Sequence, residues 1–173
     1  MKIDLKDCTI YFRDGTPTTP KEVEIKIGTG NVTFTEHFAR EYALDRGLLD
    51  TVRNGDQQPV DVSMEFQWEW LKSVLTDVPT PPEILKHEGE AADWVTSDSD
   101  TCAPYSVDIL IKHASYCADG TPREDTLLPD FRVEEMQYNI KDGQISCTGK
   151  CNTTTINNTR VAATTTGTAT ATA

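Results

Sequence analysis

The residues most able to do chemistry in this chain are its five cysteines, because a thiolate is both a nucleophile and a metal ligand. Three residues separate Cys147 from Cys151, yet no second close pair of cysteines or histidines accompanies them. A structural zinc site usually needs two such pairs, so this spacing is a weak zinc signal. The odd number, without an export signal, favours reduced thiols, some of them buried. The cysteines are Cys8, Cys102, Cys117, Cys147 and Cys151.

The histidines and acidic residues form no recognisable catalytic pattern. His37, His87 and His113 lie far apart in the sequence, and a single histidine in a strand is more often structural than catalytic. The chain has no glycine-rich phosphate loop, no Gly-x-Ser-x-Gly motif and no His-Glu-x-x-His motif. Acidic residues are so frequent that a pair of them carries no weight as an acid and base dyad. We therefore predict a protein that is not an enzyme and that uses no cofactor and no metal.

The strongest structural pattern is the strict alternation of apolar and polar side chains over residues 60–70. A period of two is typical of a strand with one buried face, whereas a helix would distribute these apolar side chains around its axis. We predict a long strand with an apolar inner face and a strongly acidic outer face. Trp68 and Trp70 share the apolar phase, which favours core packing over an exposed platform that stacks on carbohydrate.

Shorter patterns predict that the rest of the domain is mainly β. The turn at residues 141–143 contains Asp-Gly, which is typical of a tight hairpin. The apolar phase changes between Val133 and Met136, which predicts a bulge. One helix is expected at residues 82–92, with Thr80 as its N-terminal cap. The further predicted strands cover residues 3–12, 22–27, 31–38, 107–113, 131–140 and 144–148.

Two segments do not fit this series of short strands. Residues 39–59 are rich in charge and longer than most loops, and they contain enough apolar side chains to pack against another surface. Residues 152–173 are rich in threonine and carry a single charge, Arg160, so they should be flexible unless a neighbour holds them. We therefore divide the chain into a β domain at residues 1–151 and a threonine-rich arm at residues 152–173.

The charge of the chain limits its partners. Its 28 acidic residues outnumber its 16 lysines and arginines, which gives a formal net charge of −12. Proteins that grip nucleic acid do so mainly through lysines and arginines that neutralise phosphates, so this composition argues against such a role. The sequence has no apolar run near the roughly 20 residues that span a bilayer and no signal-peptide pattern, so we expect neither membrane insertion nor secretion.

The stretch that joins the charged segment to the alternating strand resembles the tail tube proteins, or major tail proteins, of long-tailed bacteriophages. Its most specific part is residues 41–71, which begin EYALDRGLLDTVRNGDQQPV, and the resemblance extends over about residues 1–150. Members of this family fold as a small β-sandwich with one flanking helix and assemble as hexameric rings. Their inner strands join into a continuous β-barrel, and the rings stack into a tube through which the genome passes. The resemblance therefore implies a virion structural protein.

The resemblance implies roles for two sets of residues. In the family, the long loop between two inner strands reaches the adjacent ring, so residues of the charged segment would form intersubunit ion pairs. The strands on either side of this loop line the lumen, and an acidic wall would repel DNA phosphates rather than hold them. The ring-stacking residues would be Arg46, Asp50, Arg53 and Asp56, and the lumen-lining residues would be Thr33, Thr35, His37, Asp61, Ser63, Glu65, Gln67 and Glu69.

The resemblance also implies partners and a location. The main partner would be the chain itself, in helically stacked hexameric rings, whose closed barrel removes the exposed strand edges of a single subunit. Other partners would be a sheath if the tail is contractile, a tape measure protein, a baseplate or tip protein, and a terminator. DNA would pass through the lumen without specific binding. The protein would be assembled in the host cytoplasm and reside in the phage tail. If thiols bond, we expect Cys147 and Cys151, beside the threonine-rich end, to reach another subunit.

One alternative class stays open from the sequence. A secreted or surface β-sandwich that binds glycans, with the threonine-rich end as a linker, would need exposed aromatic residues and an export route. The sequence shows neither clearly. Electron microscopy of the purified protein distinguishes the two classes, because rings or tubes support assembly and a monomer that binds polysaccharide supports the alternative.

Overall fold

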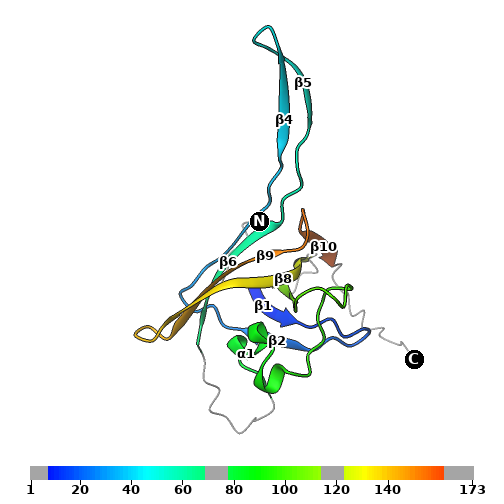
Figure 1. Cartoon of the computed structure of the whole chain (residues 1–173). Coiled ribbons are helices and arrows are strands. Elements are labelled where there is room, and N and C mark those ends of the chain that lie inside the picture. Colours follow the sequence, from blue (N-terminus) through cyan, green and yellow to red (C-terminus); the bar gives the residue numbers. More distant parts are fainter. Residues whose placement is uncertain (1–7, 69–77, 114–122, 162–173) are drawn as a thin grey trace, which may run out of the picture.

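The computed structural model describes residues 8–68, 78–113 and 123–161, and this part of the chain is mainly antiparallel β structure (Figure 1). Among the described residues between β6 and β7 are a short α-helix and a 3-10 turn. The elements are β1 (Cys8–Arg13), β2 (Glu22–Ile25), β3 (Val32–Thr35), β4 (Arg40–Asp45), β5 (Leu48–Asn54), β6 (Val60–Gln67), α1 (Pro81–Lys86), η2 (Gly89–Ala91), β7 (Val107–His113), β8 (Arg123–Asn139), β9 (Gln144–Cys151) and β10 (Asn157–Val161).

All the described strands except β4 and β5 belong to one antiparallel sheet. Its order is β2-β1-β7-β8-β9-β6-β3, and β10 also pairs with β8. The long strand β8 connects the two halves of this sheet, because its first part pairs with β7 and β10 and its second part pairs with β9. A register shift between Val133 and Glu135 confirms the predicted bulge in β8.

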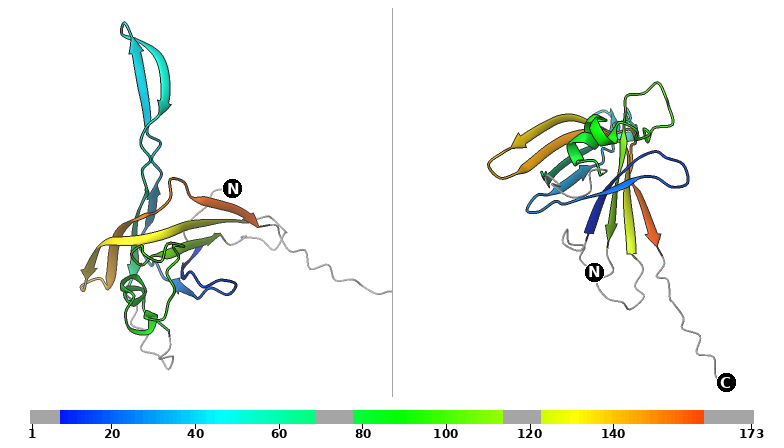
Figure 2. Two further views of the ribbon diagram at one scale, coloured as in Figure 1. Left: turned by 45° about the vertical axis from the view of Figure 1, so that its right-hand side comes forward. Right: turned by 90° about the horizontal axis from the view of Figure 1, so that it is seen from below.

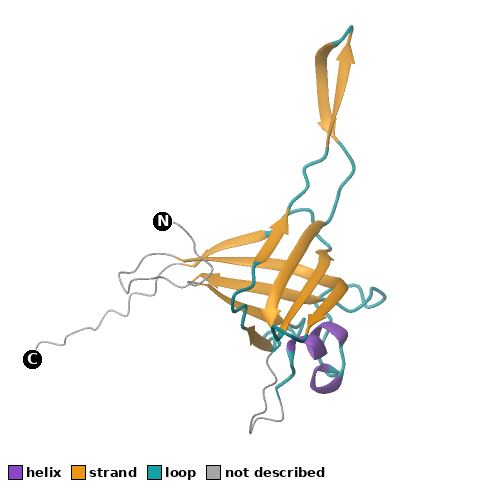
Figure 3. Cartoon of the chain, turned by 90° about the vertical axis from the view of Figure 1, so that its left-hand side faces the viewer, coloured by secondary structure: helices purple, strands orange, loops and turns teal. Residues whose placement is uncertain are grey.

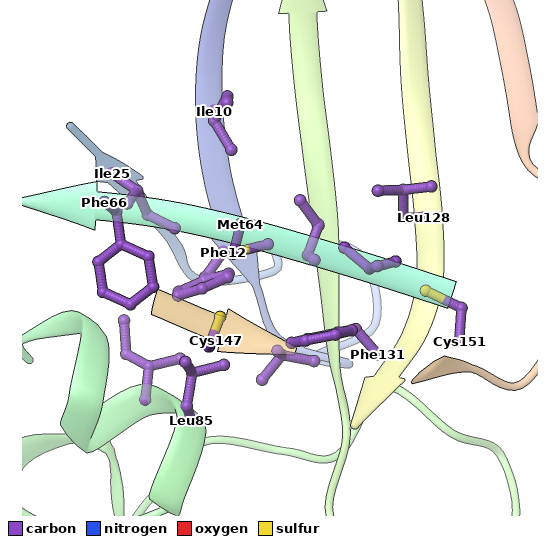
Figure 4. Close-up of a cluster of buried hydrophobic side chains, with 14 of the residues drawn as sticks. Ile10, Phe12, Ile25, Met64, Phe66, Leu85, Leu128, Phe131, Cys147 and Cys151 are labelled. Atoms are coloured by element: carbon purple, nitrogen blue, oxygen red, sulfur yellow. The ribbon is translucent and has the colours of Figure 1, made fainter. Parts of the chain in front are cut away.

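The sheet folds back on itself, so that β1 faces β6 across the core (Figure 4). Phe12 of β1 and Phe66 of β6 meet edge to face, with their ring centroids 6.2 Å apart and their planes at 88°. Val60, Val62, Met64 and Phe66 are each at most 2% exposed, which confirms the strand and the buried face predicted from the alternation. Burial of each such side chain contributes about 1.5–3 kcal/mol to stability.

The helix is shorter than the sequence predicts. Thr80 is its N-cap, as expected, and the Glu83 carboxylate accepts hydrogen bonds from the Thr80 backbone N–H at 2.7 Å and from its hydroxyl at 2.9 Å. The helix ends at Lys86 because His87 adopts a left-handed conformation, with φ of 57°. Ile84 and Leu85 are buried in the hydrophobic core, at the end of the body that lies away from β4 and β5 (Figure 3).

Trp68 corrects one prediction about the core. Strand β6 ends at Gln67, and Trp68 is 40% exposed, so the expectation that Trp68 packs in the core is wrong. The Trp68 backbone N–H still donates to the Gly143 carbonyl at 2.7 Å, but its ring contacts the partly exposed Tyr138 of β8. Trp70 lies outside the described residues.

Part of the threonine-rich segment is a strand of the main sheet. β10 pairs with the first part of β8, from Asn157 opposite Leu127 to Val161 opposite Arg123. The sequence predicts that this segment is flexible unless a neighbour holds it, and for β10 that neighbour is β8. β8 begins eight residues before the predicted start at residue 131, and this extra length is the part that pairs with β10.

Candidate assembly surface

The charged segment forms a two-stranded hairpin rather than the predicted loop. Among the described strands, β4 and β5 pair only with each other, and they project from the body of the molecule (Figures 1 and 2). Arg46 and Gly47, with φ of 50° and 83°, form the turn, and two successive positive φ values are typical of a type I′ hairpin turn. Every residue of both strands is exposed. A lone two-stranded hairpin is marginally stable in water, so this one is suited to packing against another surface.

Cross-strand pairing gives the hairpin one apolar side. Tyr42 lies opposite Val52 and Leu44 lies opposite Leu49, and residues opposite each other point to the same side. We call these four residues the hairpin apolar face; their exposed fractions are 64% for Tyr42 and Leu44, 74% for Leu49 and 58% for Val52. A period of two does not reveal this face in the sequence because a register shift in β5 breaks the alternation. Pairing residues outward from a two-residue turn at Arg46 and Gly47 indicates Tyr42, Leu44 and Leu49 but not Val52.

The four predicted ring-stacking residues occupy different places on this hairpin. Arg46 lies in the turn, the register shift leaves Asp50 without an opposite residue, and Asp56 lies between β5 and β6. Arg53 lies opposite Glu41 and forms an ion pair with it, with 2.6 Å between Nε and Oε2. One of the four predicted residues is therefore already paired within the chain.

Most of the predicted lumen-lining residues share one face of β3 and β6. Thr33 lies opposite Ser63 and Thr35 lies opposite Asp61, while the alternate residues of both strands point toward the core. Glu69 lies outside the described residues. We call this surface, formed by the described residues Thr33, Thr35, Asp61, Ser63, Glu65 and Gln67 with the neighbouring residues Thr148 and Lys150 of β9, the polar sheet face.

Asp61 has a cationic or polar neighbour on two sides. Its Oδ2 lies 2.7 Å from Nε2 of His37, which brings together two of the predicted residues, and its Oδ1 lies 4.0 Å from Nζ of Lys150 in β9. Lys150 was missed because only the register of β9 on β6 places it opposite Asp61. On the next strand, Glu135 lies opposite Thr148 of β9 and extends the polar sheet face. The face therefore carries acidic groups and at least one lysine.

Two strand edges of this part of the sheet are unpaired among the described strands. β3 pairs only with β6, and beyond Phe131 the strand β8 pairs only with β9. These edges lie at opposite ends of the order β8-β9-β6-β3. An unpaired edge offers backbone N–H and C=O groups to another chain, so each is a place where a second copy can add a strand.

A partly buried ion pair connects the segment before β7 to β8. Nη2 of Arg132 lies 2.5 Å from Oδ2 of Asp98, and Oδ1 of Asp98 accepts a hydrogen bond from the Asp100 backbone N–H at 2.9 Å. The Asp100 N–H, and after it Arg132, lower the pKa of Asp98 below its ordinary value of 3.8. The pair holds this segment against the strand that connects the two halves of the sheet.

Two of the cysteines belong to the core. Cys147 and Cys151 of β9 are free thiols that are 1% and 0% exposed. Burial raises the pKa of each thiol to about 12. A disulfide from either residue to another subunit would require β9 to leave the core. Cys102 is an exposed free thiol, and Cys117 lies outside the described residues.

Each histidine contacts a structural neighbour. His37 pairs with an aspartate, the His87 ring stacks on Tyr105 at a centroid distance of 4.1 Å, and Nδ1 of His113 lies 2.9 Å from Sγ of Cys8. Within the ranges that the structure describes, no three His, Cys, Asp or Glu side chains come together to hold a metal ion.

The helices of the described residues are far too short to cross a membrane. α1 has six residues, whereas a span needs roughly 20 apolar residues. No protein-family model matches the chain, and no curated protein sequence matches it significantly.

Proposed function

We propose that this chain is a tail tube protein of a long-tailed bacteriophage, a virion structural subunit whose β-sandwich assembles into hexameric rings that stack into a conduit for DNA. The observation that carries the proposal is the position of the β4 and β5 hairpin. It leaves the body between β3 and β6, which are paired strands with a polar outer face. In the family that the sequence resembles, the element that reaches the next ring lies between two strands that line the lumen.

The strand edges support a ring. In a closed barrel, β3 of one subunit would pair with the second part of β8 of the next subunit, and the order β8-β9-β6-β3 would continue around the tube. Closure of the barrel would remove the two edges that are unpaired among the described strands. Ring formation therefore has a physical reason in the monomer.

The polar sheet face supports a lumen through which DNA moves. Glu65 and Glu135 are exposed on it, and Asp61 is shared between His37 and Lys150. Carboxylates repel DNA phosphates. Because the face has few lysines and arginines, DNA that touches it would release few counterions and would therefore bind weakly. The acidic character proposed for the lumen thus rests on Glu65 and Glu135 more than on Asp61.

The glycan-binding alternative finds less support in the geometry. Trp68 and Tyr138 are partly exposed neighbours, with ring centroids 5.4 Å apart, but their planes meet at 62°. Flat sugar rings stack best on a coplanar aromatic platform, which this pair does not provide. We therefore keep assembly as the proposed function.

Electron microscopy of the purified protein at high concentration tests this proposal. The expected result is hexameric rings or tubes, with β3 and β6 on the inner wall in a cryo-EM reconstruction. A monodisperse monomer at all concentrations would contradict the proposal. So would a tube in which Glu65 and Asp61 lie on the outer wall.

A further inference from the structure

A second exposed apolar surface lies at the end of β6 remote from the hairpin. It consists of Trp68, just after β6, with Tyr138 of β8 and Ile140 in the turn that follows. Their exposed fractions are 40%, 37% and 83%. The Trp68 and Tyr138 rings contact each other edge to face, and Nζ of Lys86 lies 5.5 Å from the Tyr138 ring centroid. We call Trp68, Tyr138 and Ile140 the aromatic patch.

The topology sets the hairpin apolar face and the aromatic patch at opposite ends of one strand. The hairpin joins β6 at Val60, and Trp68 follows its last residue, Gln67. At about 3.3 Å per residue, β6 alone spans roughly 25 Å, and the hairpin apolar face lies beyond its start. The hairpin also points away from the turn between β8 and β9, so it cannot cover the patch of its own chain (Figure 1).

A chain with complementary surfaces at its two ends can repeat head to tail without limit, because each added copy presents a new free end. Stacking of rings along an axis requires this arrangement. The hairpin offers aliphatic side chains, and the patch offers tryptophan and tyrosine, the residue types that most often supply binding energy at protein interfaces. Both surfaces are exposed in the single chain, so their contact would remove two apolar patches from water.

We propose that the hairpin apolar face of one subunit packs on the aromatic patch of a second copy of this chain in the adjacent ring. This inference rests on the proposed function and names the surface that receives the hairpin. Six such contacts would act together between two hexameric rings, so each single contact can be weak while the stack is stable.

Four variants test the contact from both sides. Leu49→Asp places a charge on the hairpin apolar face, and Thr51→Asp is its matched control, because Thr51 lies opposite Ala43 on the other side of the hairpin. Ile140→Asp places a charge on the aromatic patch, and Lys141→Ser changes the exposed neighbouring residue as its control. All four positions are exposed, so circular dichroism should show folded proteins.

The decisive experiment mixes the two interface variants. We expect Leu49→Asp and Ile140→Asp each to form single rings without tubes, while both controls grow tubes like the unchanged protein. A mixture of the two variant rings has one intact contact, between the hairpin of the Ile140→Asp ring and the patch of the Leu49→Asp ring. Analytical ultracentrifugation and microscopy should therefore show pairs of rings that grow no further.

Other outcomes separate this inference from the proposed function. If the unchanged protein and Ile140→Asp both grow normal tubes while Leu49→Asp does not, the hairpin docks elsewhere, and the inference is overturned while the proposed function stands. Binding of polysaccharide by the unchanged protein, lost in a Trp68→Ala variant, would assign the patch to glycans and overturn the inference. An unchanged protein that never leaves the monomeric state would overturn both proposals.

Discussion

Arg53 and Glu41 face each other across the projecting hairpin, with Nε of the arginine 2.6 Å from Oε2 of the glutamate. The arginine that the family resemblance assigns to a contact between rings thus already has a partner within its own chain. Exposed ion pairs of this kind contribute about 0.2–1 kcal/mol. The Arg53–Glu41 pair holds the two strands together on the side opposite the hairpin apolar face.

A charge exchange tests whether this pair acts within the hairpin. Arg53→Glu should impair ring stacking and leave the body folded, because two carboxylates would then lie opposite each other in the hairpin. The double variant Glu41→Arg with Arg53→Glu restores the pair in the reverse order, so tube growth should recover. If the double variant grows no better than Arg53→Glu, Arg53 contacts a charge on another subunit.

The charge of the polar sheet face should control the adhesion of DNA. Glu65→Lys replaces an exposed carboxylate by an ammonium at a proposed lumen position. We expect assembled tubes of this variant to retain DNA and to release it as salt rises. Glu24→Lys, which makes the same change at an exposed position of β2, is the control. Equal retention by both variants would argue against a luminal position for Glu65.

The contact of Phe12 with Phe66 should make Phe66 one of the most sensitive positions of the core. Phe66 is fully buried, so Phe66→Ala removes apolar contacts and leaves a cavity. We expect the free energy of unfolding to fall by about 3–5 kcal/mol in urea titrations. Ser63→Ala, on the exposed face of the same strand, should change it by less than about 0.5 kcal/mol. Similar losses of stability in the two variants would contradict the assignment of Phe66 to the buried side of β6 and of Ser63 to its exposed side.

The thiols should differ strongly in reactivity. Burial raises the pKa of Cys147 and Cys151 to about 12, so the reactive thiolate is scarce at neutral pH and the sulfurs are covered. Brief treatment with iodoacetamide followed by mass spectrometry should label the exposed Cys102 and spare Cys147 and Cys151 until the protein is denatured. Labelling of Cys147 in the native protein, or a reductant-sensitive dimer formed through it, would contradict this prediction.

Asp98 should give the protein part of its sensitivity to acid. Its pKa is lower in the folded protein than its ordinary value of 3.8, so its ionised form stabilises the fold at neutral pH. This stabilisation is lost as the pH falls through the lowered pKa. We expect Asp98→Asn to lower the Tm at about pH 7 and to approach the unchanged protein near about pH 2. Asp56→Asn removes a carboxylate at an exposed position; it is the control and should leave the Tm at about pH 7 nearly unchanged.

The sequence alone predicts those features that depend on local repetition. The alternation from Val60 to Phe66 predicts β6 and its buried side, because a strand exposes alternate residues to opposite faces. The change of phase near Val133 predicts the bulge in β8, and Thr80 predicts the start of the helix. These signals are short in range, and the structure confirms each of them.

Other features depend on which strands lie side by side, and only the tertiary structure decides them. The register of β9 brings Lys150 to Asp61, and the register shift in β5 unites Leu49 and Val52 on one side of the hairpin. Pairing with β8 makes a strand of residues whose composition indicates a flexible arm. Trp68 has the phase of a core residue but lies just beyond the end of β6, where its ring contacts the partly exposed Tyr138 of β8. Periodicity describes one strand at a time, whereas these features arise from contacts between segments far apart in the chain.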